Sequence, residues 1–183
     1  VLGSFPRTEI ADPAVGIEVG REGFVDRTDV DPSRPRDPLA PPSNGVSPGY
    51  PPEMTQSRIE EIIREEARLR NIDPDIAVRI FRAEGAGSYQ SSVPRTGSGS
   101  YNGREASFGP FQLFIGGGLG NEYERLTGRT LLTDNTADGI TNQIRFALDR
   151  AATQSWQPWY GRGPAGVGVN EGLGNARPIN NWR

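Results

Sequence analysis

A short helix with defined ends, over residues 74–84, constrains the fold of this chain more than any other stretch. Asp73 and Pro74 predict its start, because the Asp side chain can accept hydrogen bonds from the free amides of the first turn, and Pro at the first helical position loses no needed donor. Gly85 and Gly87 predict its end. Between these signals, apolar residues recur at a helical period and predict one buried face, made of Ile76, Ala77, Ile80 and Phe81.

Glu84 closes this helix on the same apolar face and is therefore the first candidate for a functional group. A helix C-terminus disfavours negative charge and partial burial disfavours ionisation, so we expect the Glu84 carboxyl to have a raised pKa. A carboxyl group that keeps its proton near neutral pH can act as a general acid. The competing interpretation is a solvated or salt-bridged Glu, with Arg79, Arg82 or Arg104 as its partner.

A second motif follows some twenty residues later, where residues 107–113 read S-F-G-P-F-Q-L. Downstream come Gly128-Arg129, the pattern Q-I-x-F-A-L-x-x-A over residues 143–151, and W-Q-P-W-Y-G over residues 156–161. Together with the R-A-E-G that contains Glu84, these features resemble the lysozyme-like, soluble lytic transglycosylase-like domains of phage virion proteins, which belong to the goose-type lysozyme superfamily. The resemblance covers about residues 55–162, with the features in the family's order and at roughly its spacing.

This resemblance implies a mainly α (α+β lysozyme-like) domain over residues 53–162, with a small β-hairpin or flap beside a cleft. The implied activity is cleavage of the β-1,4 bond between N-acetylmuramic acid and N-acetylglucosamine in peptidoglycan, with Glu84 as the catalytic acid. Ser107 and Gln112 would bind the sugar or orient Glu84, and the backbone around Gly109 would approach the substrate. The transglycosylase branch of the family needs one acid, no cofactor and no metal.

Other residues near the predicted cleft are weaker candidates. Glu105 and Asp134 are the possible second carboxylates, which a hydrolase would use to position water. Aromatic rings can stack on the apolar faces of sugars, and four residues could do so: Tyr101, Trp156, Trp159 and Tyr160. Core packing or incidental exposure is the competing role of these aromatic residues.

Composition narrows the chemistry further. The 183 residues include no Cys and no His, which excludes disulfides, Cys or His nucleophiles and the usual zinc ligand sets. The net charge of −3 gives no reason to expect nucleic acid as a partner. No apolar run approaches the roughly 20 residues of a membrane span. Carboxylates are left to carry the chemistry.

The two ends of the chain differ in composition from its middle. Residues 1–52 hold ten of the sixteen prolines, which predicts an extended Pro-rich arm or linker. We expect a partner chain to hold this arm, as in virus particles; a meander over its own domain is the alternative. Residues 163–183 are rich in Gly and Asn and predict a tail. The start at Val1 and the lack of a closing element lead us to expect a piece of a longer polypeptide.

Further helices are predicted over residues 57–70, with Ser57 and Glu60 spaced as a capping box, over residues 122–127, and from Asp134 or Asn135 to about Gln154. The expected setting is a phage tail or ejection protein that contacts peptidoglycan, and other virion proteins through its arm, and that acts in the host cell envelope. Two other classes stay open. One is a non-catalytic structural virion module with a lysozyme-like fold, and the other is a carbohydrate-binding module.

Overall fold

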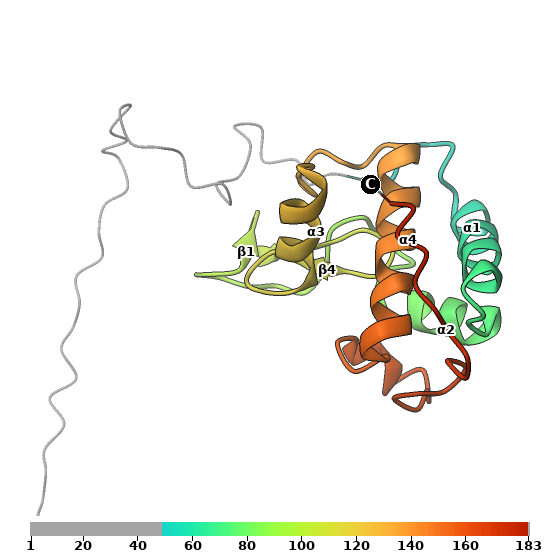
Figure 1. The fold of residues 1–183 in the computed structure, drawn as a ribbon. Coiled ribbons are helices and arrows are strands. Elements are labelled where there is room, and N and C mark those ends of the chain that lie inside the picture. Colours follow the sequence, from blue (N-terminus) through green and yellow to red (C-terminus); the bar gives the residue numbers. More distant parts are fainter. Residues whose placement is uncertain (1–48, 183) are drawn as a thin grey trace, which may run out of the picture. The chain divides into compact units, whose positions relative to one another are not determined.

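The structure, a computed structural model, describes residues 49–182. These residues form four α-helices and two small two-stranded antiparallel sheets (Figure 1). The mainly α class predicted from the sequence is confirmed at this level. The predicted Pro-rich arm, residues 1–52, lies outside the described residues except for its last four.

Helices α1 (Gln56–Leu69) and α2 (Pro74–Glu84) form a helical hairpin, and α1 packs against both α2 and the last long helix. The side chain of Thr55 caps α1 by accepting a hydrogen bond from the Arg58 amide at 3.3 Å. The helix therefore begins ahead of Ser57, the capping residue predicted from the sequence. Asp73 caps α2 as predicted, since its side chain accepts from the amide of Asp75 at 2.9 Å.

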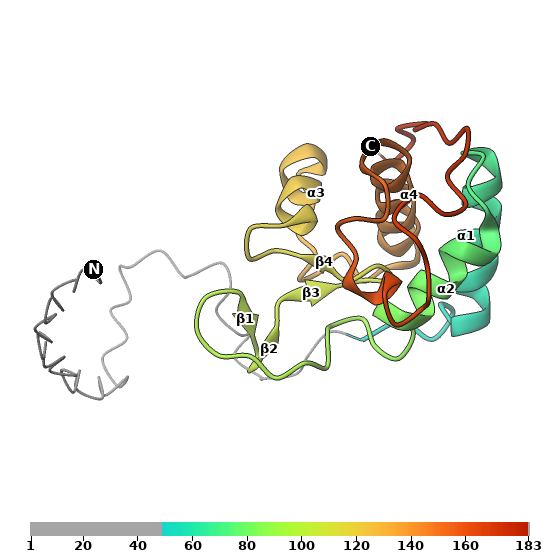
Figure 2. The ribbon, with the colours of Figure 1, turned by 90° about the horizontal axis from the view of Figure 1, so that it is seen from below.

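Helix α4 (Ala137–Gln154) is the centre of the described part of the chain. It lies between the α1–α2 pair on one side and the sheets with α3 on the other (Figures 1 and 2). Thr136 caps it, rather than the predicted Asp134 or Asn135, and accepts from the Gly139 amide at 3.1 Å. More than half of its residues are buried, among them Ile140, Ile144, Phe146, Ala147, Leu148 and Ala151.

The polar stretch between α2 and the motif at residues 107–113 contains the predicted hairpin. Strands β1 (Ser100–Tyr101) and β2 (Arg104–Glu105) pair antiparallel, with Ser100 opposite Glu105. Asn102 and Gly103 connect them with φ values of 52° and 72°. Two residues with positive φ are typical of the tight turns that match the twist of a hairpin.

The motif itself forms a second hairpin, in which β3 (Ser107–Phe108) pairs with β4 (Leu113–Phe114). Gly109 opens its turn with a φ of 76°, and a Cβ there would lie 2.1 Å from Oε1 of Gln143 in α4. Only glycine fits this close approach of the hairpin to the central helix. Helix α3 (Leu119–Thr127) follows and contacts β4; it starts three residues before the predicted Glu122.

Residues 163–182 pack against the helices, which differs from the tail predicted for residues 163–183. They hydrogen-bond to the helical part through the amide of Asp73, which donates to the Gly172 carbonyl at 2.8 Å, and the amide of Trp156, which donates to the Val169 carbonyl at 2.9 Å. Three large apolar side chains of the segment are buried: Val167, Leu173 and Trp182. A composition rich in Gly and Asn here serves closely spaced turns.

A buried carboxylate fixes the end of this segment. Asp149 of α4 accepts hydrogen bonds from the amide of Ile179 at 2.9 Å, the amide of Asn180 at 2.7 Å and the indole of Trp182 at 2.7 Å. It also pairs with the fully buried Arg70 at 2.6 Å. Buried charges are stable when paired and hydrogen-bonded, so these contacts tie the C-terminal segment to α1 and α4.

Candidate active site

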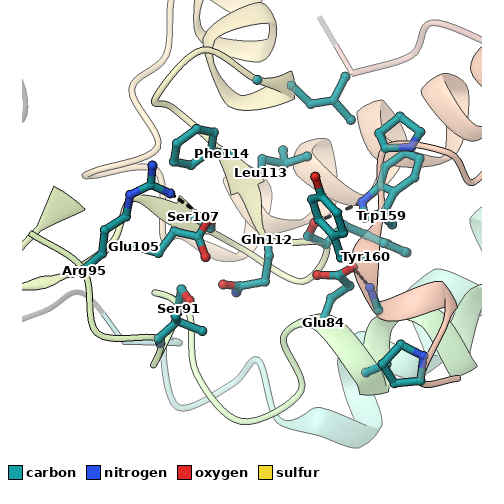
Figure 3. A pocket seen from close by; sticks show the side chains of 18 of the residues that line it. Glu84, Ser91, Arg95, Glu105, Ser107, Gln112, Leu113, Phe114, Trp159 and Tyr160 are labelled. Atoms are coloured by element: carbon teal, nitrogen blue, oxygen red, sulfur yellow. Dashed lines mark hydrogen bonds and ion pairs between the residues drawn. The ribbon is translucent and has the colours of Figure 1, made fainter. Parts of the chain in front are cut away.

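The end of α2 opens into a cavity of about 760 Å³, within the range of about 300–1,000 Å³ typical of ligand pockets. Figure 3 shows this pocket from close by. Its walls come from the end of α2, from β2, β3 and β4, from the start of α3, and from the 3-10 turn η1 (Tyr160–Arg162). Turn η1 contacts α2. Each element contributes only one or two residues, so the pocket depends on the whole fold.

Glu84 lines the pocket as the last residue of α2. Gly85 follows, and a Cβ there would lie 2.8 Å from the Gln112 side-chain nitrogen and 2.9 Å from the Gly109 carbonyl oxygen. The backbone after Glu84 can therefore approach the β3–β4 turn only because residue 85 is glycine. On the other side, the amide of Gly161 donates to Oε1 of Glu84 at 2.5 Å.

Burial raises the pKa of the Glu84 carboxyl above its ordinary value, and the negative charge of Glu105 raises this pKa further. The Gly161 amide opposes this shift by stabilising the carboxylate. The direction agrees with the expectation from the sequence, although burial is the largest cause. A half-buried carboxyl group with a raised pKa, facing a cavity, can deliver a proton.

The arginines considered as salt-bridge partners of Glu84 are engaged elsewhere or show no contact with it. Arg82 pairs with Glu60 at 2.7 Å, and Arg79 hydrogen-bonds to the carbonyl of Gly166 at 3.2 Å. Within residues 49–182 no ion pair of Glu84 occurs, with Arg104 or with any other base. Within residues 49–182, no basic side chain therefore stabilises the ionised form of Glu84.

Two residues of the sequence motif line the same pocket. Ser107 is almost fully buried in its wall, and Gln112 lies beside Glu84 in Figure 3. Gln112 has an unusual φ of 47°, and its side-chain nitrogen donates to the Gly109 carbonyl at 2.9 Å. Gly109 itself does not line the pocket: its amide donates to the Tyr89 carbonyl at 2.7 Å, which places it in the scaffold.

The four candidate aromatic residues divide evenly. Trp159 and Tyr160 line the pocket; Trp159 anchors itself through a hydrogen bond from its indole to the Phe111 carbonyl at 3.1 Å, and Tyr160 is 95% exposed. Trp156 is completely buried and packs edge-on against Trp159. Tyr101 is 4% exposed and does not reach the pocket. The last two are core residues, which corrects their expected place in the cleft.

The two candidate second carboxylates also separate. Glu105 lines the pocket and pairs with Arg95 at 3.5 Å. Asp134 does not line the pocket. Its carboxylate accepts a hydrogen bond from the Tyr123 hydroxyl at 2.7 Å and pairs with Arg129 at 3.1 Å. Asp134 is thus a structural residue, and Glu105 is the one of the two that shares the cavity with Glu84.

Several pocket residues were missed by the sequence analysis: Ser91, Arg95, Phe114, Gly161 and Glu122. Glu122 pairs with Arg150 at 2.9 Å, and Gly161 reaches Glu84 from 77 positions away. No local periodicity signals such contacts.

No protein-family model, no curated protein and no solved structure matches this chain. Within residues 49–182, no cluster of three or more acidic residues is arranged to hold a metal ion. No helix in that same part is both long and apolar enough to cross a membrane.

Proposed function

We propose that this chain is a peptidoglycan-cleaving glycosidase of lysozyme-like fold, with Glu84 as its catalytic acid. The observation that carries the proposal is the position of Glu84: half-buried, free of any ion pair among residues 49–182, and facing a cavity of about 760 Å³ with its pKa raised. The motif that resembles lytic transglycosylase-like domains contributes Ser107 and Gln112 to the same cavity. The acid and the residues of the resembled motif thus line the same cavity.

In the proposed reaction, protonated Glu84 donates its proton to the oxygen of the β-1,4 bond between N-acetylmuramic acid and N-acetylglucosamine. The bond from this oxygen to the muramic C1 breaks as an oxocarbenium-like centre develops, and the substrate's own N-acetyl group supplies nucleophilic help. The Glu84 carboxylate then takes the proton of the muramic C6 hydroxyl, whose oxygen bonds to C1. A 1,6-anhydro sugar results, and Glu84 regains its proton without water being consumed.

The residues around Glu84 suit this cycle. The Gly161 amide stabilises the carboxylate that forms after proton donation, and burial favours the acid that must be present before it. Tyr160 offers exposed aromatic surface beside the acid for a sugar ring, whereas Trp159 is only 3% exposed and forms part of the pocket wall. The proposal gives Ser107 and Gln112, which line the same cavity, the role of hydrogen-bonding the sugar or orienting Glu84.

A hydrolase is the variant of the same proposal. Glu105 would then position a water molecule for attack, since it lines the cavity, whereas Asp134 is engaged outside it. This variant yields a reducing-end sugar in place of the anhydro sugar. The proposed setting, a phage virion component that opens the host cell wall, rests on the resemblance of the sequence motifs alone.

The test is release of soluble fragments from purified peptidoglycan by the full chain. We expect wild type to release them, Glu84→Gln to lose at least about a thousandfold in rate because its acid is gone, and Glu53→Gln, the same change at an exposed position, to match wild type. A folded wild-type protein that releases nothing would refute the proposal and favour the structural virion module.

A further inference from the structure

The pocket contains a basic group at the end away from Glu84. Among the described residues that line it are three glutamates and one arginine, Arg95. Figure 3 shows Arg95, Phe114 and Glu105 together on one side of the cavity, with Glu84 and Tyr160 on the other. A ligand that fills the cavity would contact Glu84 at one end and Arg95 at the other.

Phe114 holds the Arg95 guanidinium in place. The guanidinium carbon lies 5.1 Å from the centre of the Phe114 ring, a cation–π arrangement. The ring in turn occupies a slot between glycines: a Cβ on Gly99 would lie 2.8 Å from Cζ of Phe114, and a Cβ on Gly116 would lie 2.1 Å from the same atom. This contact restrains the position of the guanidinium over the ring and leaves its N–H groups for hydrogen bonds.

The N–H donors of Arg95 make few hydrogen bonds within residues 49–182. Its contact with Glu105 is 3.5 Å long and the side chains of Arg95 and Glu105 are 42% and 31% exposed, whereas Arg82 and Glu60 approach to 2.7 Å. Across residues 49–182, Glu105 is the one side chain to which the guanidinium donates a hydrogen bond. A guanidinium carries five N–H groups, so most of them are open to a ligand.

We propose that Arg95 binds a carboxylate carried by the glycan strand and thereby selects peptidoglycan over uncharged sugar polymers. The inference rests on the function proposed above and names a specificity residue for that same site. Arginine binds carboxylates through two parallel N–H···O bonds, and a ligand carboxylate would replace the long contact with Glu105. Peptidoglycan offers such groups on its peptides, or on the lactyl group of N-acetylmuramic acid where the peptide has been removed.

Calorimetric titration of the full chain tests this, in a Glu84→Gln background that prevents turnover. Three soluble ligands are compared: peptide-bearing glycan strands, strands stripped of peptide that keep the lactyl carboxylate, and N-acetylglucosamine oligomers with no carboxylate. Adding Arg95→Gln should weaken binding of at least one carboxylate-bearing ligand by about tenfold or more and leave the uncharged oligomer unaffected. The more strongly affected strand identifies the source of the carboxylate.

Arg104→Gln is the matched control, because it removes the same charge outside the pocket from a neighbouring position: Arg104 of β2 pairs with Pro94, the residue before Arg95. The effect of Arg95→Gln should shrink as salt concentration rises, while that of Arg104→Gln stays absent. If the Glu84→Gln parent binds the ligands, the site itself exists. In that case, equal weakening of binding to all three ligands by Arg95→Gln, or no weakening of any, would overturn the proposal for Arg95. Absence of binding to all three ligands by the parent, with no cleavage by wild type, would refute the proposed function itself, and this inference with it.

Discussion

The backbone amide of Gly161 donates a hydrogen bond to Oε1 of Glu84 at 2.5 Å. The contact requires glycine, because a Cβ on residue 161 would lie 2.8 Å from that oxygen and 2.9 Å from the carboxyl carbon. Gly161 therefore sets both the position and the hydrogen bonding of the proposed catalytic acid. Gly161 belongs to the turn η1, which packs against α2.

Gly161→Ala should displace the Glu84 carboxyl and reduce the cleavage rate by about a hundredfold, since a shift of about 1 Å is enough for such a loss. Overpacking should also cost roughly 1–3 kcal/mol of unfolding free energy. Gly163→Ala is the control: it lies two residues away, where the nearest atom to an added Cβ is 3.6 Å distant. Rates from peptidoglycan digestion and urea unfolding curves provide the comparison, and equal rates for the two variants would contradict the role of Gly161.

Activity should depend on pH through Glu84. The acid must be protonated to donate, so the rate should fall as pH rises through the raised pKa of Glu84. The negative charge of Glu105 contributes to that raised pKa. Glu105→Gln should therefore move the alkaline limb of the pH–rate profile to lower pH. Glu122→Gln, a change at the pocket residue paired with Arg150, should leave the limb in place.

The same raised pKa affects stability. Between the ordinary pKa of a glutamate and the raised value, folded wild type binds more protons at Glu84 than unfolded wild type does, so this group's contribution to stability falls as pH rises. Glu84→Gln removes that dependence. Urea unfolding at pH 4 and pH 7 should show wild type losing stability relative to Glu84→Gln at the higher pH, and parallel behaviour of the two proteins would argue against a raised pKa.

Tyr160 and Trp156 should respond differently to truncation. Tyr160 is 95% exposed at the pocket, so Tyr160→Ala should weaken substrate binding several-fold and change the unfolding free energy by less than about 0.5 kcal/mol. Trp156 is fully buried, so Trp156→Ala should cost roughly 3–5 kcal/mol. Michaelis constants and thermal unfolding separate the two effects. A Tyr160→Ala variant that binds glycan strands as wild type does would remove Tyr160 from the site.

Asp149 should be essential for the docking of the C-terminal segment. Asp149→Ala leaves the fully buried Arg70 without this partner and removes the acceptor of two amides and the Trp182 indole, which should cost about 3–5 kcal/mol. Glu61→Gln, at an exposed pair with Arg58, should cost less than about 1 kcal/mol. Unfolding curves measure both, and limited proteolysis of Asp149→Ala should cut within residues 163–183 first. Equal stability of the two variants would contradict this role of Asp149 in holding the C-terminal segment.

Local sequence signals predict the helices well, because caps and periodicity act over a few residues. Asp73, Gly85 and the apolar stripe between them are enough to place Glu84 at the end of α2. The motif around Ser107 and Gln112 likewise predicts two pocket residues. The capping positions are less certain from sequence, since Thr55 and Thr136 cap their helices in place of neighbouring residues with similar propensity.

Long-range contacts are what local signals cannot supply. Trp156 and Trp159 stand three residues apart in one aromatic run, yet only the second lines the pocket, and the first packs edge-on against it in the core. Asp134 is engaged by Tyr123, a partner eleven residues away. The closeness of Gly161 to Glu84 and the packing of residues 163–182 depend in the same way on how distant segments meet.

The central claim, that Glu84 supplies the proton for cleavage of the glycan strand, is tested most directly by mass spectrometry of the products of peptidoglycan digestion. Wild type and Glu84→Gln are compared at equal concentration, with folding of both checked by circular dichroism. The account predicts anhydromuropeptides from wild type and none from Glu84→Gln; reducing-end products from wild type alone would assign the hydrolase variant. Cleavage by Glu84→Gln at the wild-type rate would contradict the account, because the proton would then come from another group.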